Sequence, residues 1–146
     1  MKFKFSLQRV LDLKEQEEQQ VKLRLQIEQK KLLEKQEQVE HLKDKIYKCL
    51  EQKKEKRITT GFDLIQYHQY TGYLEQQMKN AQREVFEQER VIGRVQQELL
   101  KITREKQTFQ KLKERQFAVF KQEQDKLEQQ QIDELTIVKH CYKKRN

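Results

Sequence analysis

The chain has 146 residues, a formal net charge of +8, 38% charged residues and only 34% hydrophobic ones. So little apolar surface excludes a large globular core, but it is enough for a narrow helical seam. Proline is absent and glycine occurs only at Gly61, Gly72 and Gly93. Proline breaks helices and glycine weakens them by about 1 kcal/mol, whereas the abundant Glu, Gln, Lys, Arg and Leu favour them. The composition indicates long helices, with disorder as the alternative.

The first predicted helix covers about residues 6–57. Ser6 is a suitable N-cap, and Phe5 and Val10 have the spacing of a hydrophobic staple around it. Side chains of the apolar seam then recur mostly every three or four residues, a spacing that favours a helix over disorder. They are Phe3, Leu7, Val10, Val21, Leu25, Leu32, Val39, Leu42, Ile46 and Cys49.

A turn is predicted at about residues 58–62, followed by a second helix over about residues 63–140. Gly61 is suited to the left-handed geometry that ends helices, and Asp63 with Gln66 resembles a capping box. The second helix carries sustained heptads, which are typical of a coiled coil. Its seam reads Tyr67, Tyr70, Leu74, Met78, Ala81, Val85, Gln88, Ile92, Val95, Leu99, Ile102, Lys106 and Phe109. We therefore predict one all-α unit over residues 1–146, an antiparallel two-helix coiled-coil hairpin.

The polar interruptions of the two seams suggest a register. In an antiparallel hairpin the numbers of facing residues add to a constant, and a turn near Gly61 sets that constant at about 123. Glu17 then faces Lys106 as an ion pair, and Lys35 faces Gln88. Phe3 faces Phe120, so helix 2 continues beyond helix 1 by about 20 residues, or about 30 Å. The hairpin is thus expected to have unequal arms, with helix 2 overhanging at its C-terminal end.

Motifs for catalysis or ligand binding are missing from the sequence. There is no glycine-rich phosphate loop, nucleophile elbow or HExxH motif, and the three histidines have no partner at ligand spacing. Cys49 and Cys141 are far apart and have no metal-type spacing. We expect no enzyme activity, cofactor, metal or small-molecule substrate. The lack of a signal peptide and of an apolar run of about 20 residues favours a cytosolic protein with reduced thiols.

Two surface features near the predicted turn favour contact with other macromolecules. Basic residues are frequent over residues 43–57, which suggests either a solvated helix face or, less well, a nucleic-acid-binding rod without a recognisable module. Aromatic residues are also concentrated there, namely Tyr47, Phe62, Tyr67, Tyr70 and Tyr73. A seam takes only about two positions in seven, so the remaining rings form either a small cap core or a protein contact surface.

Three segments resemble the flagellar export protein FliJ family. They are the opening Phe-Lys-Phe-Ser-Leu-Gln-Arg-Val-Leu-Asp of residues 3–12, the Tyr-His-Gln-Tyr of residues 67–70 followed by Leu74-Glu75, and the Glu-Gln-Gln-Gln-Ile-Asp-Glu-Leu of residues 128–135. The similarity covers nearly the whole chain. It implies a cytoplasmic, non-enzymatic component of the bacterial flagellar type III export apparatus, similar in shape to the central stalk of rotary ATPases.

The resemblance also implies partners. They are the flagellar export ATPase hexamer, the cytoplasmic domain of the export-gate membrane protein, and export chaperones for late substrates, at the inner face of the cell membrane. A generic scaffold coiled coil, for example a parallel homodimer, is the alternative.

The residues that these partners would contact lie at the two ends of the hairpin. The gate patch maps by position to Gln36, Leu42, Tyr47, Tyr70 and Leu74, although the chain departs from a family pattern at Gln77 and Ala81. The export ATPase would contact the end that holds both termini. The residues assigned there are Phe5, Arg9, Phe120, Leu127, Ile132, Asp133, Glu134 and Leu135.

Overall fold

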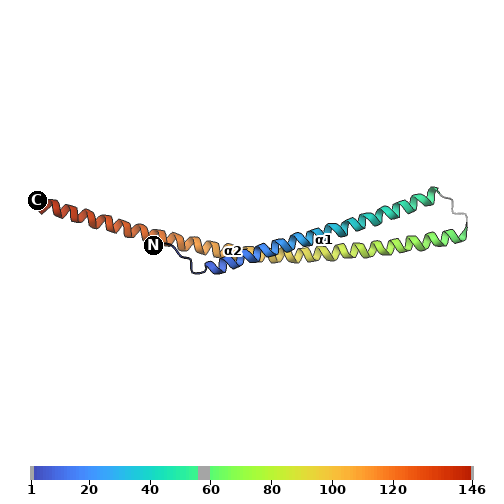
Figure 1. Cartoon of the computed structure of the whole chain (residues 1–146), viewed down its shortest axis with the longest axis horizontal. Coiled ribbons are helices and arrows are strands. Elements are labelled where there is room, and N and C mark those ends of the chain that lie inside the picture. The colour runs from blue at the N-terminus through green and yellow to red at the C-terminus, as the bar shows by residue number, and fades with distance from the viewer. Residues whose placement is uncertain (1, 56–59, 146) are drawn as a thin grey trace. The chain divides into compact units, whose positions relative to one another are not determined.

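A computed structural model describes residues 2–55 and 60–145 of the chain. Helix α1 spans Gln8–Glu55, 48 residues, and helix α2 spans Gly61–Arg145, 85 residues (Figure 1). Within the described ranges these are the only helices and there is no strand. The prediction of an all-α hairpin with unequal arms is confirmed. Residues 58 and 59 of the predicted turn, and the predicted end of helix 1 at residue 57, lie outside the described residues.

Helix α1 begins at Gln8, two residues later than predicted. The Gln8 amide donates to the Phe5 carbonyl at 3.1 Å, and the Leu11 amide donates to the Leu7 carbonyl at 3.0 Å. Phe5 is only 8% exposed, whereas Ser6 lies on the surface in the turn before the helix. The burial of Phe5, and not a Ser6 cap, therefore fixes where the chain enters α1.

Helix α2 begins with a cap on Thr60, and the prediction of an Asp63 cap is wrong. The Thr60 hydroxyl oxygen accepts the Asp63 amide at 3.2 Å, and the Thr60 carbonyl accepts the Leu64 amide at 3.3 Å. This is the geometry of a threonine N-cap, with Asp63 placed favourably near the positive end of the helix. Gly61 is the first residue of α2 and does not have a positive φ, so it does not end helix 1 in the predicted left-handed conformation.

The chain forms two compact units, each built from one stretch of α1 and one of α2. Unit 1 contains Met1–Glu18 and Lys101–Asn146, and unit 2 contains Gln19–Leu100. In each unit the two helices run antiparallel (Figure 1). The core of unit 2 is a single row of buried apolar side chains, as expected for a seam. They are Val21, Val39, Cys49, Leu74, Ala81, Ile92 and Val95.

One polar layer interrupts the core of unit 2. Gln88 is 5% exposed, and its amide nitrogen donates to the Glu28 carbonyl at 3.0 Å and to the Glu28 carboxylate at 2.5 Å. The hydrogen bond from Gln88, and secondarily the one from Lys31, lowers the pKa of Glu28. Gln88 thus contacts Glu28, and the predicted pairing of Gln88 with Lys35 is replaced. Because both Gln88 amide hydrogens have an acceptor on Glu28, burial of this amide leaves no donor unsatisfied.

A second polar layer lies in unit 1 around Glu18, which is 4% exposed. Its carboxylate pairs with the Lys106 ammonium at 3.3 Å and accepts the Thr103 hydroxyl at 3.2 Å. The predicted partner of Lys106, Glu17, instead pairs with Lys14 at 3.4 Å. The predicted ion pair is therefore wrong by one residue, which is a rotation of about 100° around the helix.

The contacts between α1 and α2 follow the predicted register only in part. The Lys53 ammonium lies 5.0 Å from the centre of the Tyr67 ring, and the residue numbers of this pair add to 120. The numbers of Glu28 and Gln88 add to 116, whereas those of Phe3 and Phe120 add to the predicted 123 and those of Glu18 and Lys106 add to 124. No single sum therefore describes the pairing, and the predicted polar partners of Lys106 and Gln88 are replaced by other residues.

The Gln88 layer gives a stability prediction. Gln88→Ala leaves a cavity and removes both hydrogen bonds to Glu28, so we expect the free energy of unfolding to fall by about 1–3 kcal/mol. Urea denaturation followed by circular dichroism measures this change. Adding Glu28→Ala to Gln88→Ala costs less than Glu28→Ala in the wild type, because the one hydrogen bond between the two side chains is already lost. Lys35→Ala, by contrast, should change the free energy of unfolding equally in the wild type and in Gln88→Ala. If the effects of Lys35→Ala and Gln88→Ala are not additive, the result would support the predicted pairing of Lys35 with Gln88 instead.

A pH prediction follows from three shifted groups. The ion pair between Lys14 and Glu105, 2.8 Å long, lowers the pKa of Glu105 and raises that of Lys14, while Gln88 lowers the pKa of Glu28. The two carboxylates stabilise the fold above pH 4.5, and this stability is lost as the pH falls through their lower folded pKa values. Lys14 acts in the opposite sense, because its contribution is complete below pH 10.5 and is lost as the pH rises through its higher folded pKa.

We therefore expect the urea midpoint to fall between neutral pH and a pH of about 3. A Glu28→Gln, Glu105→Gln double variant should lose less stability over the same interval. An equal loss in the variant and the wild type would show that other carboxylates cause the acid sensitivity.

Candidate partner-binding surfaces

The end of α1 and the start of α2 carry exposed apolar and aromatic side chains in unit 2. We call this set the turn-end surface, and it consists of Tyr47, Leu50, Phe62, Leu64, Ile65, Tyr70 and Tyr73. Tyr67 is half-buried beneath the Lys53 ammonium, a cation–π contact. The seam therefore absorbs only Tyr67 of the five aromatic residues that the sequence groups near the turn. Exposed aromatic rings gathered at one end are typical of a protein contact surface.

The five residues assigned to the gate patch do not share one environment. Gln36 is exposed, and the Tyr47 and Tyr70 side chains are 62% and 49% exposed. Leu42 is half-buried in a shallow groove. Leu74 is 2% exposed and belongs to the core, so it acts on a partner only through the packing of its neighbours. The groove around Leu42 is also lined by Gln38, His41, Gln77, Asn80, Ala81 and Glu84, which includes both positions where the chain departs from the family pattern.

In unit 1, residues 2–7 form a non-helical N-terminal segment that lies along α2 (Figure 1). The Phe3 ring is 5.4 Å from the Phe117 ring and 5.5 Å from the Phe120 ring, which confirms the predicted contact of Phe3 with Phe120. Phe5 is buried, whereas Arg9 is exposed. The alternation of Phe3 and Phe5 is a sequence signal that could have indicated an extended segment, since a period of two does not suit a helix.

The overhang, residues 121–145 of α2, continues past the contacts of the N-terminal segment (Figure 1). Every residue in it is exposed except Gln124, which is half-buried. Its large apolar side chains remain open to solvent, and they are Leu127, Ile132, Leu135, Ile137, Val138 and Tyr142. The charged residues assigned to the same end, Asp133 and Glu134, are also exposed. The overhang therefore keeps part of the heptad pattern without a stretch of α1 opposite it.

No group of three or more His, Cys, Asp or Glu side chains is placed to hold a metal ion in the part of the chain that the structure describes. Cys49 is buried and Cys141 is exposed, and both are free thiols. Among the same residues, no helix has the length and apolarity needed to span a bilayer.

A substitution of Phe3 tests whether the N-terminal segment is anchored on α2. Phe3→Ala removes ring contacts with Phe117 and Phe120, so we expect a loss of about 1–2 kcal/mol in the free energy of unfolding and faster amide exchange near Phe5. Phe86→Ala is the matched control, because Phe86 is 60% exposed and its loss should cost less than about 0.5 kcal/mol. Equal effects of the two substitutions would argue against a docked segment.

Comparison with known proteins places this arrangement in a family. The model of the family described as Flagellar FliJ protein matches residues 3–145, a range that includes the N-terminal segment, both helices and nearly all of the overhang. The Flagellar FliJ protein of Bacillus subtilis (strain 168) is 28% identical over 149 aligned residues, which cover 94% of this chain and 95% of that protein. No solved structure matches the chain. The family match extends over nearly the whole chain and agrees with the resemblance in the sequence, and the chain therefore belongs to the flagellar FliJ protein family.

Proposed function

We propose that this flagellar protein is a non-enzymatic component of the flagellar type III export apparatus. In this proposal its terminal end inserts into the hexameric export ATPase, and its turn-end surface contacts the cytoplasmic domain of the export-gate membrane protein. The observation that carries the proposal is the overhang, a long stretch of α2 whose apolar side chains have no partner in the described chain.

The overhang supports a role at the ATPase for an energetic reason. A helix with no packing partner lacks the tertiary contacts that give most helices in proteins their stability, and covering one Leu or Ile side chain contributes about 1.5–3 kcal/mol. Leu127, Ile132 and Leu135 are each more than half exposed, so a ring of subunits closing around them would stabilise both the helix and the complex. Phe5, Arg9 and Phe120 lie at the base of the same end, where the N-terminal segment meets α2.

The turn-end surface supports a separate contact. Tyr47 and Tyr70 present large exposed rings, and tyrosine loses little conformational entropy when it is fixed at an interface. We assign the gate contact to these rings together with Gln36 and Leu42. Export chaperones for late substrates are further proposed partners, without assigned residues. The protein would act in the cytoplasm, associated peripherally with the inner face of the membrane at the flagellar base.

The mechanism requires no chemistry on this chain, and we propose neither a cofactor nor a small-molecule substrate. A rod that contacts the subunits of a ring differently changes the relative stability of their conformations. Such differential contacts would promote assembly of the hexamer and bias its nucleotide turnover.

Deleting residues 121–146 tests the ATPase contact. We expect the truncated protein to keep its helical hairpin by circular dichroism but to lose promotion of export ATPase hexamers and stimulation of ATP hydrolysis, because the apolar stripe is gone. Phe86→Ala is the control and should stimulate like the wild type. Full stimulation by the truncated protein, or none by the wild type, would contradict the proposed role.

A Tyr47→Ala, Tyr70→Ala double variant tests the gate contact. Loss of two interface tyrosines should weaken binding to the purified gate domain by at least about tenfold, since each central ring contributes about 1 kcal/mol or more. Isothermal titration calorimetry measures the affinity, and the ATPase stimulation of this variant should stay unchanged. If gate binding persists while ATPase stimulation disappears, the two ends have been assigned the wrong way round.

A further inference from the structure

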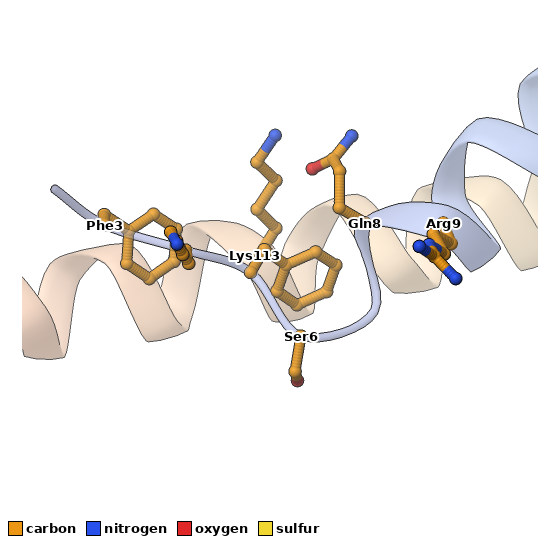
Figure 2. A pocket seen from close by; sticks show the side chains of 7 residues that line it. Phe3, Ser6, Gln8, Arg9 and Lys113 are labelled. Carbon is orange, nitrogen blue, oxygen red and sulfur yellow. The ribbon is translucent and has the colours of Figure 1, made fainter.

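The N-terminal segment, the first turn of α1 and one residue of α2 line a hollow in unit 1. Phe3 and Phe5 form part of its wall. The Lys113 side chain comes from α2 and extends away from Ser6, on the same side as Gln8 (Figure 2). Gln8 and Arg9, in the first turn of α1, line the side farther from Phe3 (Figure 2). The hollow exists because the docked segment bridges from Phe3 to the start of α1, and neither helix alone would create it.

The charge of this hollow is unbalanced. Lys4, Arg9 and Lys113 line it, and no carboxylate is among its described lining residues. Lys113 is half-buried and has no ion pair in the described part of the chain. The half-buried lysines Lys14 and Lys106 of the same unit, by comparison, each contact a glutamate.

The acidic residues nearest in sequence to the lining residues are Glu114 on α2 and Asp12 on α1, and neither lines the hollow. Asp12 is the first acidic residue of the chain, and its carboxylate accepts a hydrogen bond from the Gln8 side-chain amide at 2.9 Å. It is exposed and does not line the hollow. A half-buried lysine that shares a hollow with two other cations and with no described carboxylate attracts an anion more strongly than an isolated lysine in open solvent.

We propose that this hollow binds an acidic segment of a partner protein, with an Asp or Glu carboxylate between Lys113 and Arg9 and an apolar neighbour on Phe3. Three cations among the lining residues of one concave hollow that also holds aromatic rings fit a carboxylate carried on an apolar chain. A flat surface of anionic lipids is the alternative occupant, and it fits a concave hollow less well than an extended peptide does. The inference deepens the proposed function at the terminal end and rests on it only for where the partner arrives.

The test uses the full chain and a labelled, end-blocked peptide of alternating Glu and Leu, with binding followed by fluorescence anisotropy at low salt. An Arg9→Gln, Lys113→Gln double variant should bind the peptide at least about tenfold more weakly than the wild type. The matched control is Lys79→Gln, Arg83→Gln, which removes two exposed charges of unit 2 and should leave binding nearly unchanged. Equal weakening in both variants, or no binding by the wild type, overturns the proposal.

A second readout separates this inference from its alternatives. If vesicles containing phosphatidylserine, and not the peptide, bind in a manner that depends on Arg9 and Lys113, the hollow recognises a lipid surface and the proposal fails. If peptide binding depends on these residues but the wild type does not stimulate the export ATPase, the inference stands and the proposed function fails. If stimulation is normal in the double variant and peptide binding is unchanged, only the inference fails. Circular dichroism checks that both double variants fold.

Discussion

The fold depends on the match between two narrow seams, and in this chain the polar layers decide that match. Apolar side chains at heptad spacing hold α1 against α2, but they fit almost equally well after a shift of three, four or seven residues. Glu18 with Lys106 and Thr103, and Gln88 with Glu28, satisfy their buried groups in the observed register. A shifted register would leave a buried carboxylate without its cation, a cost of several kcal/mol. These layers thus specify the alignment more than they add to stability.

The alignment in turn places the two ends. Helix α1 and its N-terminal segment reach Phe120 on α2, and the overhang continues from there with exposed apolar side chains. At the other end, Thr60 starts α2 soon after α1 ends, and most of the aromatic rings near the turn remain outside the seam. A slip in the register would change which α2 residues are left without a stretch of α1 opposite them. It would therefore also change where the overhang begins and which α2 residue lines the basic hollow. The proposed contact surfaces follow from the pairing, although they lie outside it.

Much of this architecture could be predicted from the sequence, because it depends on features with a strong one-dimensional signal. The scarcity of helix breakers, the heptads of α2 and the greater length of the second heptad run predicted the hairpin, its unequal arms and the contact of Phe3 with Phe120. The register could not be predicted in the same way. It rests on whether Glu17 or Glu18 turns inward, and adjacent glutamates in a drifting seam offer no pattern to distinguish them.

The sequence predicted the wrong cap for α2 and did not predict the hollow, and these two failures have related causes. Gly61 and Thr60 are neighbours that both suit helix ends, and only the hydrogen bond from the Asp63 amide to Thr60 shows which one starts α2. The heptads place Leu74 in the seam and the family resemblance places it in the gate patch, and the structure buries it, as the heptads predict. Lys113 gave no signal at all, because its environment is made by a non-helical segment more than 100 residues earlier in the chain. Docking of that segment depends on tertiary contacts that periodicity cannot describe.

The most direct test of the account is a double-mutant cycle on the Glu18 layer. Glu18→Ala and Lys106→Ala, singly and together, give the coupling free energy between the two side chains from urea denaturation. The observed register predicts a coupling of about 1–3 kcal/mol for Glu18 with Lys106 and almost none for Glu17 with Lys106. Strong coupling of Lys106 to Glu17, with none to Glu18, would contradict both the register and the argument that polar layers set it.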